Sequence, residues 1–285
     1  FNGLVSLVYG IAYPFLVRDL PGGEKFKGTA KADPMTVSSW GDLIQYLAWS
    51  FPLVGAMMIL TWRLSNVMID GAPVISGWPL YAVYGVLTLV YVAHVAKTLQ
   101  INVPILKAGV PEEDKYHWGS VAALNSTYFA NFGAELAVVS MLPMFFENTF
   151  SQLQSSEGNY IMTATLSGVI AASFAFVNLL ARPLGGLLSD TMKNRKRTML
   201  TYMVGIAFGF LGMASIGQYG EVVDGQQMIV PMFDGTLWLV IAVVITILCS
   251  MFVQGAEGAT FAVIPMIKKD MTGQIAGMAG AYGNV

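Results

Sequence analysis

A single arginine lies within a long apolar part of the chain. Arg182 is the only formal charge in residues 158–189. If this segment crosses a membrane, an arginine at its centre costs about 2.5 to 3.5 kcal/mol, and something must offset that cost. The planar guanidinium presents paired donors that match a flat oxyanion, and its charge persists at any working pH. Arg182 is therefore either a ligand for an anion or the structural partner of Glu135 or Glu257.

Aromatic and polar side chains share one face of a second apolar segment. Tyr128 and Phe132 are four residues apart, and so are Asn131 and Glu135, so the helical period places all four on one broad face. Counted inward from the polar ends of their segments, Tyr128 and Arg182 both lie about 12 to 13 Å deep. An aromatic pair at this spacing is usually plain packing, but the matched depth makes Tyr128 and Phe132 candidates for the same site as Arg182.

A glycine-rich stretch near the end of the sequence favours a close approach to the backbone. Glycines at 273, 277, 280 and 283 recur at every third or fourth position, which leaves one smooth face on a helix. Asn284 adds a polar amide that hydrocarbon would penalise unless it found a partner. The group that approaches is either a ligand or, equally well, a packed helix.

A short polar connection joins two apolar segments near residue 190. It contains Asp190, Arg195 and Lys196, and it follows Gly186, which permits close helix contact. An aspartate can meet a helix N-terminus or a cation, and basic residues hold a loop on the cytoplasmic side. These four residues suggest a gating loop that does not touch substrate; the alternative is a simple topology signal.

The composition excludes several classes of protein. Of the 285 residues 11% are charged and 55% are hydrophobic, whereas soluble domains carry roughly 25% charged residues. With a net charge of -2 and no basic stripe outside short loops, no nucleic-acid partner is expected. The single Cys249 and the two histidines are too few for a disulfide framework or a metal site, so we expect no metal and no cofactor.

Few residues in the apolar segments could carry out catalysis. Glu135 and Glu257 are the only carboxylates within the securely assigned apolar segments, and no histidine accompanies them. The lone Cys249 lies about two turns from Glu257 without a base to activate it. We therefore expect no catalytic residues, and a membrane enzyme is the weakest of the functional hypotheses.

The apolar segments predict an all-α, polytopic membrane helix bundle, because each is about as long as a helix needs to cross the hydrocarbon layer. They lie near residues 3–17, 43–64, 78–96, 119–146, 160–188, 198–217, 236–266 and from 273 onward. A polar loop is expected at 18–42, and whether 43–64 and 78–96 both cross the membrane is left open. Because the sequence begins at Phe1 and stops in mid-pattern at Val285, we expect a fold truncated at both ends.

Cations set the expected orientation, since lysine and arginine in short loops accumulate on the cytoplasmic side. Clusters at 193–197, at 268–269 and between 97 and 115 mark inside loops. The connections 147–159 and 218–235 contain acidic residues but no lysine or arginine, so we place them outside. From residue 119 onward, successive apolar segments cross the membrane in alternating directions, in agreement with these loop assignments.

These motifs resemble those of the major facilitator superfamily and, within it, of the nitrate/nitrite porter family. The segment 186–197 resembles the superfamily's loop between helices 8 and 9, although Thr191 replaces a basic residue. Residues 181–186 resemble the helix 8 segment that bears the family's substrate arginine. Residues 128–132 resemble the helix 7 aromatic pair that flanks the anion, and 280–285 resemble the nitrate signature of helix 11.

The resemblance implies a secondary active transporter that moves nitrate, nitrite or both by alternating access. Arg182 would supply charge and a bidentate contact, Tyr128 a hydroxyl donor and Phe132 a flat wall. Gly280 and Gly283 would let the backbone approach the anion, and Asn284 would add a donor. The alternative is another facilitator of the same superfamily, for a different small anion, a carboxylate or a sugar.

The resemblance also implies a division of the chain. Residues 1–96 would form the end of an N-terminal bundle, 97–118 a central cytoplasmic loop, and 119–285 a C-terminal bundle with helices 7 to 10 and the start of 11. The expected location is a bacterial inner (plasma) membrane, with nitrate or nitrite and membrane lipid as partners. Protons are candidate coupling ions, and the oligomeric state stays open.

Overall fold

The computed structural model describes residues 2–16, 34–223 and 225–285. The chain divides into two units, residues 1–34 and 35–285, and each is described by itself. The first unit contains helix α1 (Asn2–Leu16), which is apolar and has mostly exposed side chains. Most of the polar loop expected at 18–42 lies outside the described residues.

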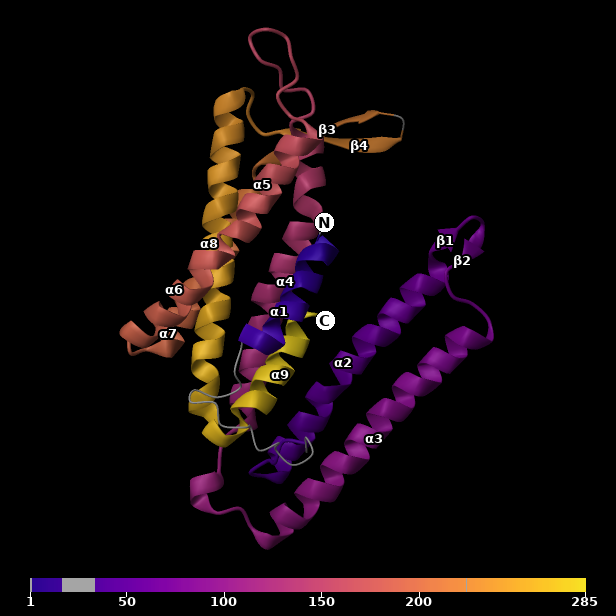
Figure 1. Cartoon of the computed structure of the whole chain (residues 1–285), viewed down its shortest axis with the longest axis vertical. Coiled ribbons are helices and arrows are strands. Elements are labelled where there is room, and N and C mark those ends of the chain that lie inside the picture. Colours follow the sequence, from indigo (N-terminus) through magenta and orange to yellow (C-terminus); the bar gives the residue numbers. More distant parts are fainter. Residues whose placement is uncertain (1, 17–33, 224) are drawn as a thin grey trace. The chain divides into compact units, whose positions relative to one another are not determined.

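Helices make up most of the second unit, which confirms the expected helical membrane bundle (Figure 1). They are α2 (Trp40–Asn66), α3 (Trp78–Ala108), α4 (Trp118–Thr149), α5 (Ala164–Phe176), α6 (Asn178–Thr191), α7 (Arg195–Ala214), α8 (Thr236–Ile267) and α9 (Thr272–Gly283), with 3-10 turns at Glu112–Asp114 and Lys269–Met271. Among the described residues six helical stretches are long and apolar enough to cross a membrane. Both α2 and α3 belong to these six, so both segments whose crossing was left open have the required length and composition.

Two antiparallel hairpins were not anticipated from the sequence. The short strands β1 (Met68–Ile69) and β2 (Ala72–Pro73) are joined through Asp70 and Gly71, whose positive φ angles of 51° and 79° suit a tight hairpin turn. In the connection expected at 218–235, β3 (Gly217–Val223) pairs with β4 (Gln226–Pro231). Hydropathy did not reveal these strands because they are short and their pairing depends on contacts between two strands.

Helix α3 is longer than expected. It was expected to end near residue 96, but it continues to Ala108, so the first half of the predicted connection 97–118 is helical. A buried amide lies in this extension: Asn102 donates to the Met35 carbonyl at 3.1 Å and accepts from the Val37 backbone N–H at 2.8 Å. Asn102 therefore ties the segment that precedes α2 to the last turns of α3.

The segment expected as one span at 160–188 is one membrane-length helical stretch, Ala164–Thr191, which is interrupted at Val177 between α5 and α6. The carbonyl of Phe174 accepts hydrogen bonds from the side chains of Ser250 (2.7 Å) and Gln254 (2.9 Å), both on α8. In a continuous helix this carbonyl would accept from the N–H of Asn178. Donors from a neighbouring helix therefore account for the interruption.

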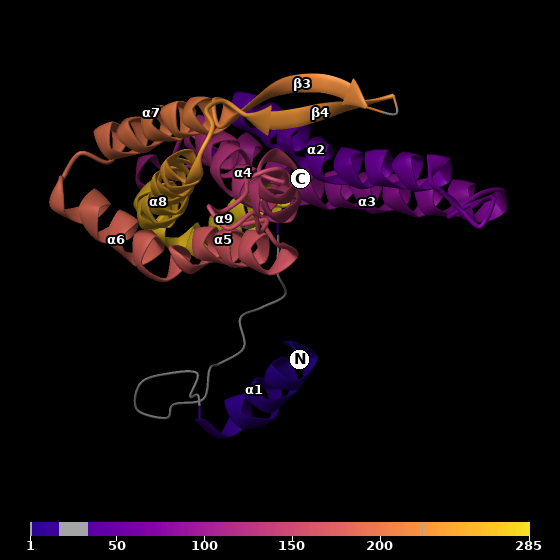
Figure 2. The ribbon, with the colours of Figure 1, turned by 90° about the horizontal axis from the view of Figure 1, so that it is seen from above.

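Helix α8 is the centre of the bundle, and α4, α5, α6 and α7 all pack against it (Figure 2). Its contact with α6 is backbone to backbone. A Cβ atom on Gly258 would overlap the carbonyl oxygen of Arg182, and one on Gly185 would overlap that of Gly255. Glycines on both helices thus set the distance at which α6 presents Arg182 to α8.

This close contact generates a stability prediction. We expect Gly258→Ala to destabilise the protein by about 1 to 3 kcal/mol, since the added methyl group must push two backbones apart. The measurement is the midpoint of thermal unfolding of the purified protein. Gly168→Ala on α5 is the control, because within the described part of the chain no atom lies within 4 Å of its added Cβ, and its midpoint should be unchanged or slightly higher. Equal midpoints for the two variants would contradict the proposed importance of the close α6–α8 contact for stability.

Candidate functional site

Three helices meet at a buried group of charges formed by Glu135, Arg182 and Glu257. Arg182 of α6 donates through Nη2 to Glu135 Oε2 of α4 at 3.2 Å, and through the same nitrogen to Glu257 Oε2 of α8. The sequence left open whether Arg182 has a carboxylate partner, and the structure shows that both candidate carboxylates take part. We call these three residues the charge cluster.

The arginine is the accessible member of the charge cluster. Its side chain is 35% exposed, against 10% for Glu135 and 0% for Glu257. Among the described residues, its ion pairs use only Nη2, and the buried Nε has no hydrogen-bond partner. A guanidinium carries five N–H donors. One edge of Arg182 is therefore held by carboxylates while further donors remain for another ligand.

Polar amides complete the surroundings of Glu135. Its Oε1 accepts from Asn178 Nδ2 at 3.2 Å and from Gln254 Nε2 at 3.4 Å. Neither amide was predicted from the sequence as part of the site. Their spacing carried a signal, since Asn178 lies one turn before Arg182 on α6 and Gln254 one turn before Glu257 on α8.

The two predicted aromatic residues lie beside the arginine. The rings of Tyr128 and Phe132 are stacked, with centroids 5.2 Å apart and an interplanar angle of 9°. Phe261 of α8 packs edge-on against Tyr128 at 5.1 Å. The Arg182 Cζ lies 5.8 Å from the Phe132 centroid, within the range of a cation–π contact. Arg182, Phe132 and Tyr128, on two different helices, therefore come together.

Of the three residues expected from the end of the chain, the structure brings only Gly283 into this group. A Cβ atom on Gly283 would lie 2.7 Å from Phe132 Cδ1 and 2.7 Å from Tyr128 Cε1, so the backbone of α9 lies directly against the aromatic pair. No atom of the described residues lies within 4 Å of a Cβ on Gly280. Asn284 is exposed, and its amide donates to the Gly280 carbonyl at 2.9 Å, within its own segment.

The expected gating residues form a compact turn between α6 and α7. Arg195 pairs with Asp190 at 2.5 Å and also donates to Ser189 Oγ at 3.2 Å. The side chain of Asn194 caps α7 by accepting from the Arg197 N–H at 3.1 Å. Gly186 faces α8, where a Cβ would meet the Gly258 carbonyl at 3.6 Å. The turn thus links the charged connection to the α6–α8 crossing.

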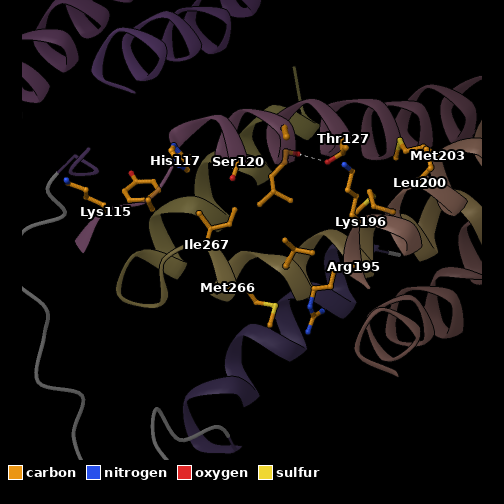
Figure 3. Close-up of a pocket in the computed structure, with 15 residues that line it drawn as sticks. Lys115, His117, Ser120, Thr127, Arg195, Lys196, Leu200, Met203, Met266 and Ile267 are labelled. Carbon is orange, nitrogen blue, oxygen red and sulfur yellow. Dashed lines mark hydrogen bonds between the residues drawn. The ribbon is translucent and has the colours of Figure 1, made fainter. Parts of the chain in front are cut away.

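Arg195 and Lys196 also line a cavity of about 780 Å³ between the ends of α4, α7 and α8 (Figure 3). Its wall contains Lys115 and His117 at one end and methionine and leucine side chains along its length. The cavity shares no residue with the charge cluster, although Thr127 in its wall is the neighbour of Tyr128 in the sequence. A role in gating stays a prediction.

Comparison with known proteins gives relatives along the whole chain. The nitrate/nitrite transporter NrtP of Picosynechococcus sp. is 39% identical over 100% of this chain and 48% of its own length. NrtP of Nostoc punctiforme is 35% identical over 99% of this chain and 51% of its own length. The high-affinity nitrate transporter 2.3 of Oryza sativa subsp. japonica is 33% identical over 56% and 26%, respectively. This chain belongs to the nitrate/nitrite porter family of the major facilitator superfamily.

Membership in this family confirms the resemblance seen in the sequence. The chain spans about half the length of the two cyanobacterial relatives. No family model and no solved structure matches it. The relatives are named as transporters, and six apolar helical stretches make this chain an integral membrane protein. The expected division into residues 1–96, 97–118 and 119–285 stays a prediction.

The charge cluster generates a second stability prediction. We expect Arg182→Met to destabilise the protein by about 3 kcal/mol, because it leaves two carboxylates facing each other without their cation. Adding Glu135→Gln and Glu257→Gln to that variant should restore most of the loss, since no uncompensated charge then remains. The measurement is again the midpoint of thermal unfolding, with Arg197→Met on the exposed start of α7 as the control. A triple variant no more stable than Arg182→Met would show that the three charges do not act together.

Proposed function

We propose that the whole protein moves nitrate and nitrite across a bacterial plasma membrane by alternating access. The similarity of the entire chain to two proteins named as nitrate/nitrite transporters supports the substrate. The observation that carries the site is the placement of Arg182. Arg182 lies in an apolar bundle, its side chain is one-third exposed, and it keeps unused donors beside the stacked rings of Tyr128 and Phe132. Such an arrangement suits a small planar anion.

Each residue of the proposed site has a separate task. Arg182 attracts the anion and donates charge-assisted hydrogen bonds, which are about twice as strong as neutral ones. Phe132 provides a flat wall, and the hydroxyl of Tyr128 provides a donor. Gly283 keeps the α9 backbone close to the two rings. Contacts from Gly280 and Asn284 stay predictions.

Alternating access requires the site to open to one side of the membrane at a time. The Asp190–Arg195 ion pair joins the start of α7 to the end of α6, the helix that presents Arg182. Breaking and re-forming this pair, with Gly186 and Lys196 moving alongside, would bias the equilibrium between the two states.

The alternative function is that of a facilitator for another small anion or carboxylate. Competition by formate, chlorate and acetate against nitrate uptake separates the two functions.

Replacing Arg182 by lysine tests its role directly. Lysine keeps the charge but loses the planar fork of donors. Loss of one charge-assisted hydrogen bond, about 1.5 to 3 kcal/mol, corresponds to a fall in nitrate uptake of roughly ten- to a hundredfold. The measurement is uptake of isotopically labelled nitrate by proteoliposomes that contain the whole protein, with Arg197→Lys as the control. Normal uptake by Arg182→Lys would overturn the assignment.

The contact of Gly283 with the aromatic pair gives a further prediction. We expect Gly283→Ala to reduce nitrate affinity, because the new methyl group displaces the stacked rings of Tyr128 and Phe132. Gly277→Ala adds the same methyl group earlier on the same helix, where no described atom lies within 4 Å, and should leave the affinity nearly unchanged. Binding of nitrate to the two purified variants, measured by calorimetry, distinguishes them. An equal loss of affinity in the two variants would show that the contact of Gly283 with the aromatic pair does not shape the site.

A further inference from the structure

A buried amide on α4 has no hydrogen-bond partner. Asn125 is 0% exposed, and neither its Nδ2 nor its Oδ1 is paired with another group among the described residues. Asn102, which is equally buried, donates to the Met35 carbonyl and accepts from the Val37 N–H. Buried polar groups are normally paired, because leaving them unpaired costs free energy of folding. Packing alone therefore does not account for an asparagine at position 125.

Asn125 shares a face of α4 with the proposed anion site. It lies three residues before Tyr128 and seven before Phe132, so the helical period directs the three side chains to one side of the helix. The rise from Asn125 to Tyr128 is about 4.5 Å along the helix axis. The proposed site therefore has an amide with unused donors one step away along α4.

A second buried donor continues this face. The indole Nε1 of Trp118, seven residues before Asn125, is buried and has no hydrogen-bond partner within the described part of the chain. Amide and indole N–H groups are both donors, and an anion that has left water needs donors. Residues 118–132 contain no charged side chain, so this face of α4 offers an anion donors without a carboxylate.

Aromatic rings from three helices close the end of the bundle to which this face leads. It is the end at which α4 and α9 begin, after the connections that basic residues mark as cytoplasmic. Trp49 of α2 lies 6.4 Å from the Trp118 ring and 5.3 Å from the Tyr282 ring of α9, and the Tyr282 hydroxyl donates to the Trp49 carbonyl. Asp42 of α2 also accepts from the Trp118 backbone N–H at 3.1 Å. An anion can pass Trp118 only when α2 separates from α4 and α9.

We propose that Asn125 is a further contact for the transported anion, on the path between Arg182 and the cytoplasmic end of α4. This inference rests on the proposed function. The amide Nδ2 donates a neutral hydrogen bond to an anion oxygen, which is weaker than the charge-assisted bonds of Arg182. An anion that leaves the guanidinium is therefore held briefly and released, whereas a second strong site would retain it. Because Asn125 is fully buried in this state, the contact forms as α2 moves away from α4.

Transport and binding separate this role from that of Arg182. We expect Asn125→Ala in the whole protein to lower the uptake of labelled nitrate by proteoliposomes about three- to tenfold, which corresponds to one neutral hydrogen bond. The Kd of nitrate, measured by calorimetry, should stay within about twofold, since Arg182 still binds the anion. Asn148→Ala, at an exposed position of the same helix, is the control and should not change uptake.

The outcomes for the two proposals differ. Unchanged uptake by Asn125→Ala would overturn this inference and leave the proposed function intact. Absence of nitrate binding by the unmodified protein would overturn the proposed function itself. Asn125→Ser has almost the same size as Asn125→Ala but keeps an O–H donor, and it should recover part of the uptake. Equal uptake by these two variants would contradict a hydrogen bond from position 125 to the anion.

Thermal unfolding tests whether Asn125 has a structural task instead. Asn125→Ala removes an unpaired amide and introduces a better helix former, so the midpoint should be unchanged or higher. Asn102→Ala is the matched control, because it removes an equally buried amide that is paired, and its midpoint should fall by a few degrees. An equally large fall in Asn125→Ala would show that the amide stabilises the fold and would overturn the inference.

Discussion

One guanidinium nitrogen is shared by two carboxylates from two other helices, and this shared contact ties α4, α6 and α8 together. Each of the three charges would be costly alone in hydrocarbon, so none is stable there without the others. Because Arg182 is the only member with substantial exposure, the cluster presents a positive group outward and keeps its negative groups inside. The same contact that stabilises the bundle therefore belongs to the anion site that we propose.

The geometry of this contact depends on glycines and on one backbone carbonyl that accepts from side chains of a neighbouring helix. Glycines on α6 and α8 let the two backbones touch at the level of Arg182, which leaves its side chain directed toward Glu257. Ser250 and Gln254 of α8 hold the Phe174 carbonyl, and the resulting break between α5 and α6 lies next to Asn178, which supports Glu135. Packing, backbone hydrogen bonding and charge thus act at one level of the bundle.

Features that depend on a single helix could be predicted from the sequence, and features that depend on a pair of helices largely could not. Hydropathy gave the helices because their apolar runs are continuous, and helical spacing placed Tyr128 and Phe132 on one face. Whether Arg182 meets Glu135, Glu257 or both depends on how three helices cross, which no spacing encodes. The β3–β4 hairpin and the position at which α3 ends were not predicted for the same reason. Cross-strand pairing and the contacts of Asn102 leave no signal in hydropathy. Gly280 and Gly283 look alike in sequence, and only the structure separates them.

The decisive experiment is a structure of the whole protein with nitrate bound. We expect anion density within hydrogen-bonding distance of the Arg182 guanidinium, about 2.7 to 2.9 Å, with the plane of the anion against the Phe132 ring. A guanidinium held by both carboxylates through all its donors, with the anion bound elsewhere, would refute the proposed site. Arg182 would then be a structural residue only, and the site would have to be sought on other helices.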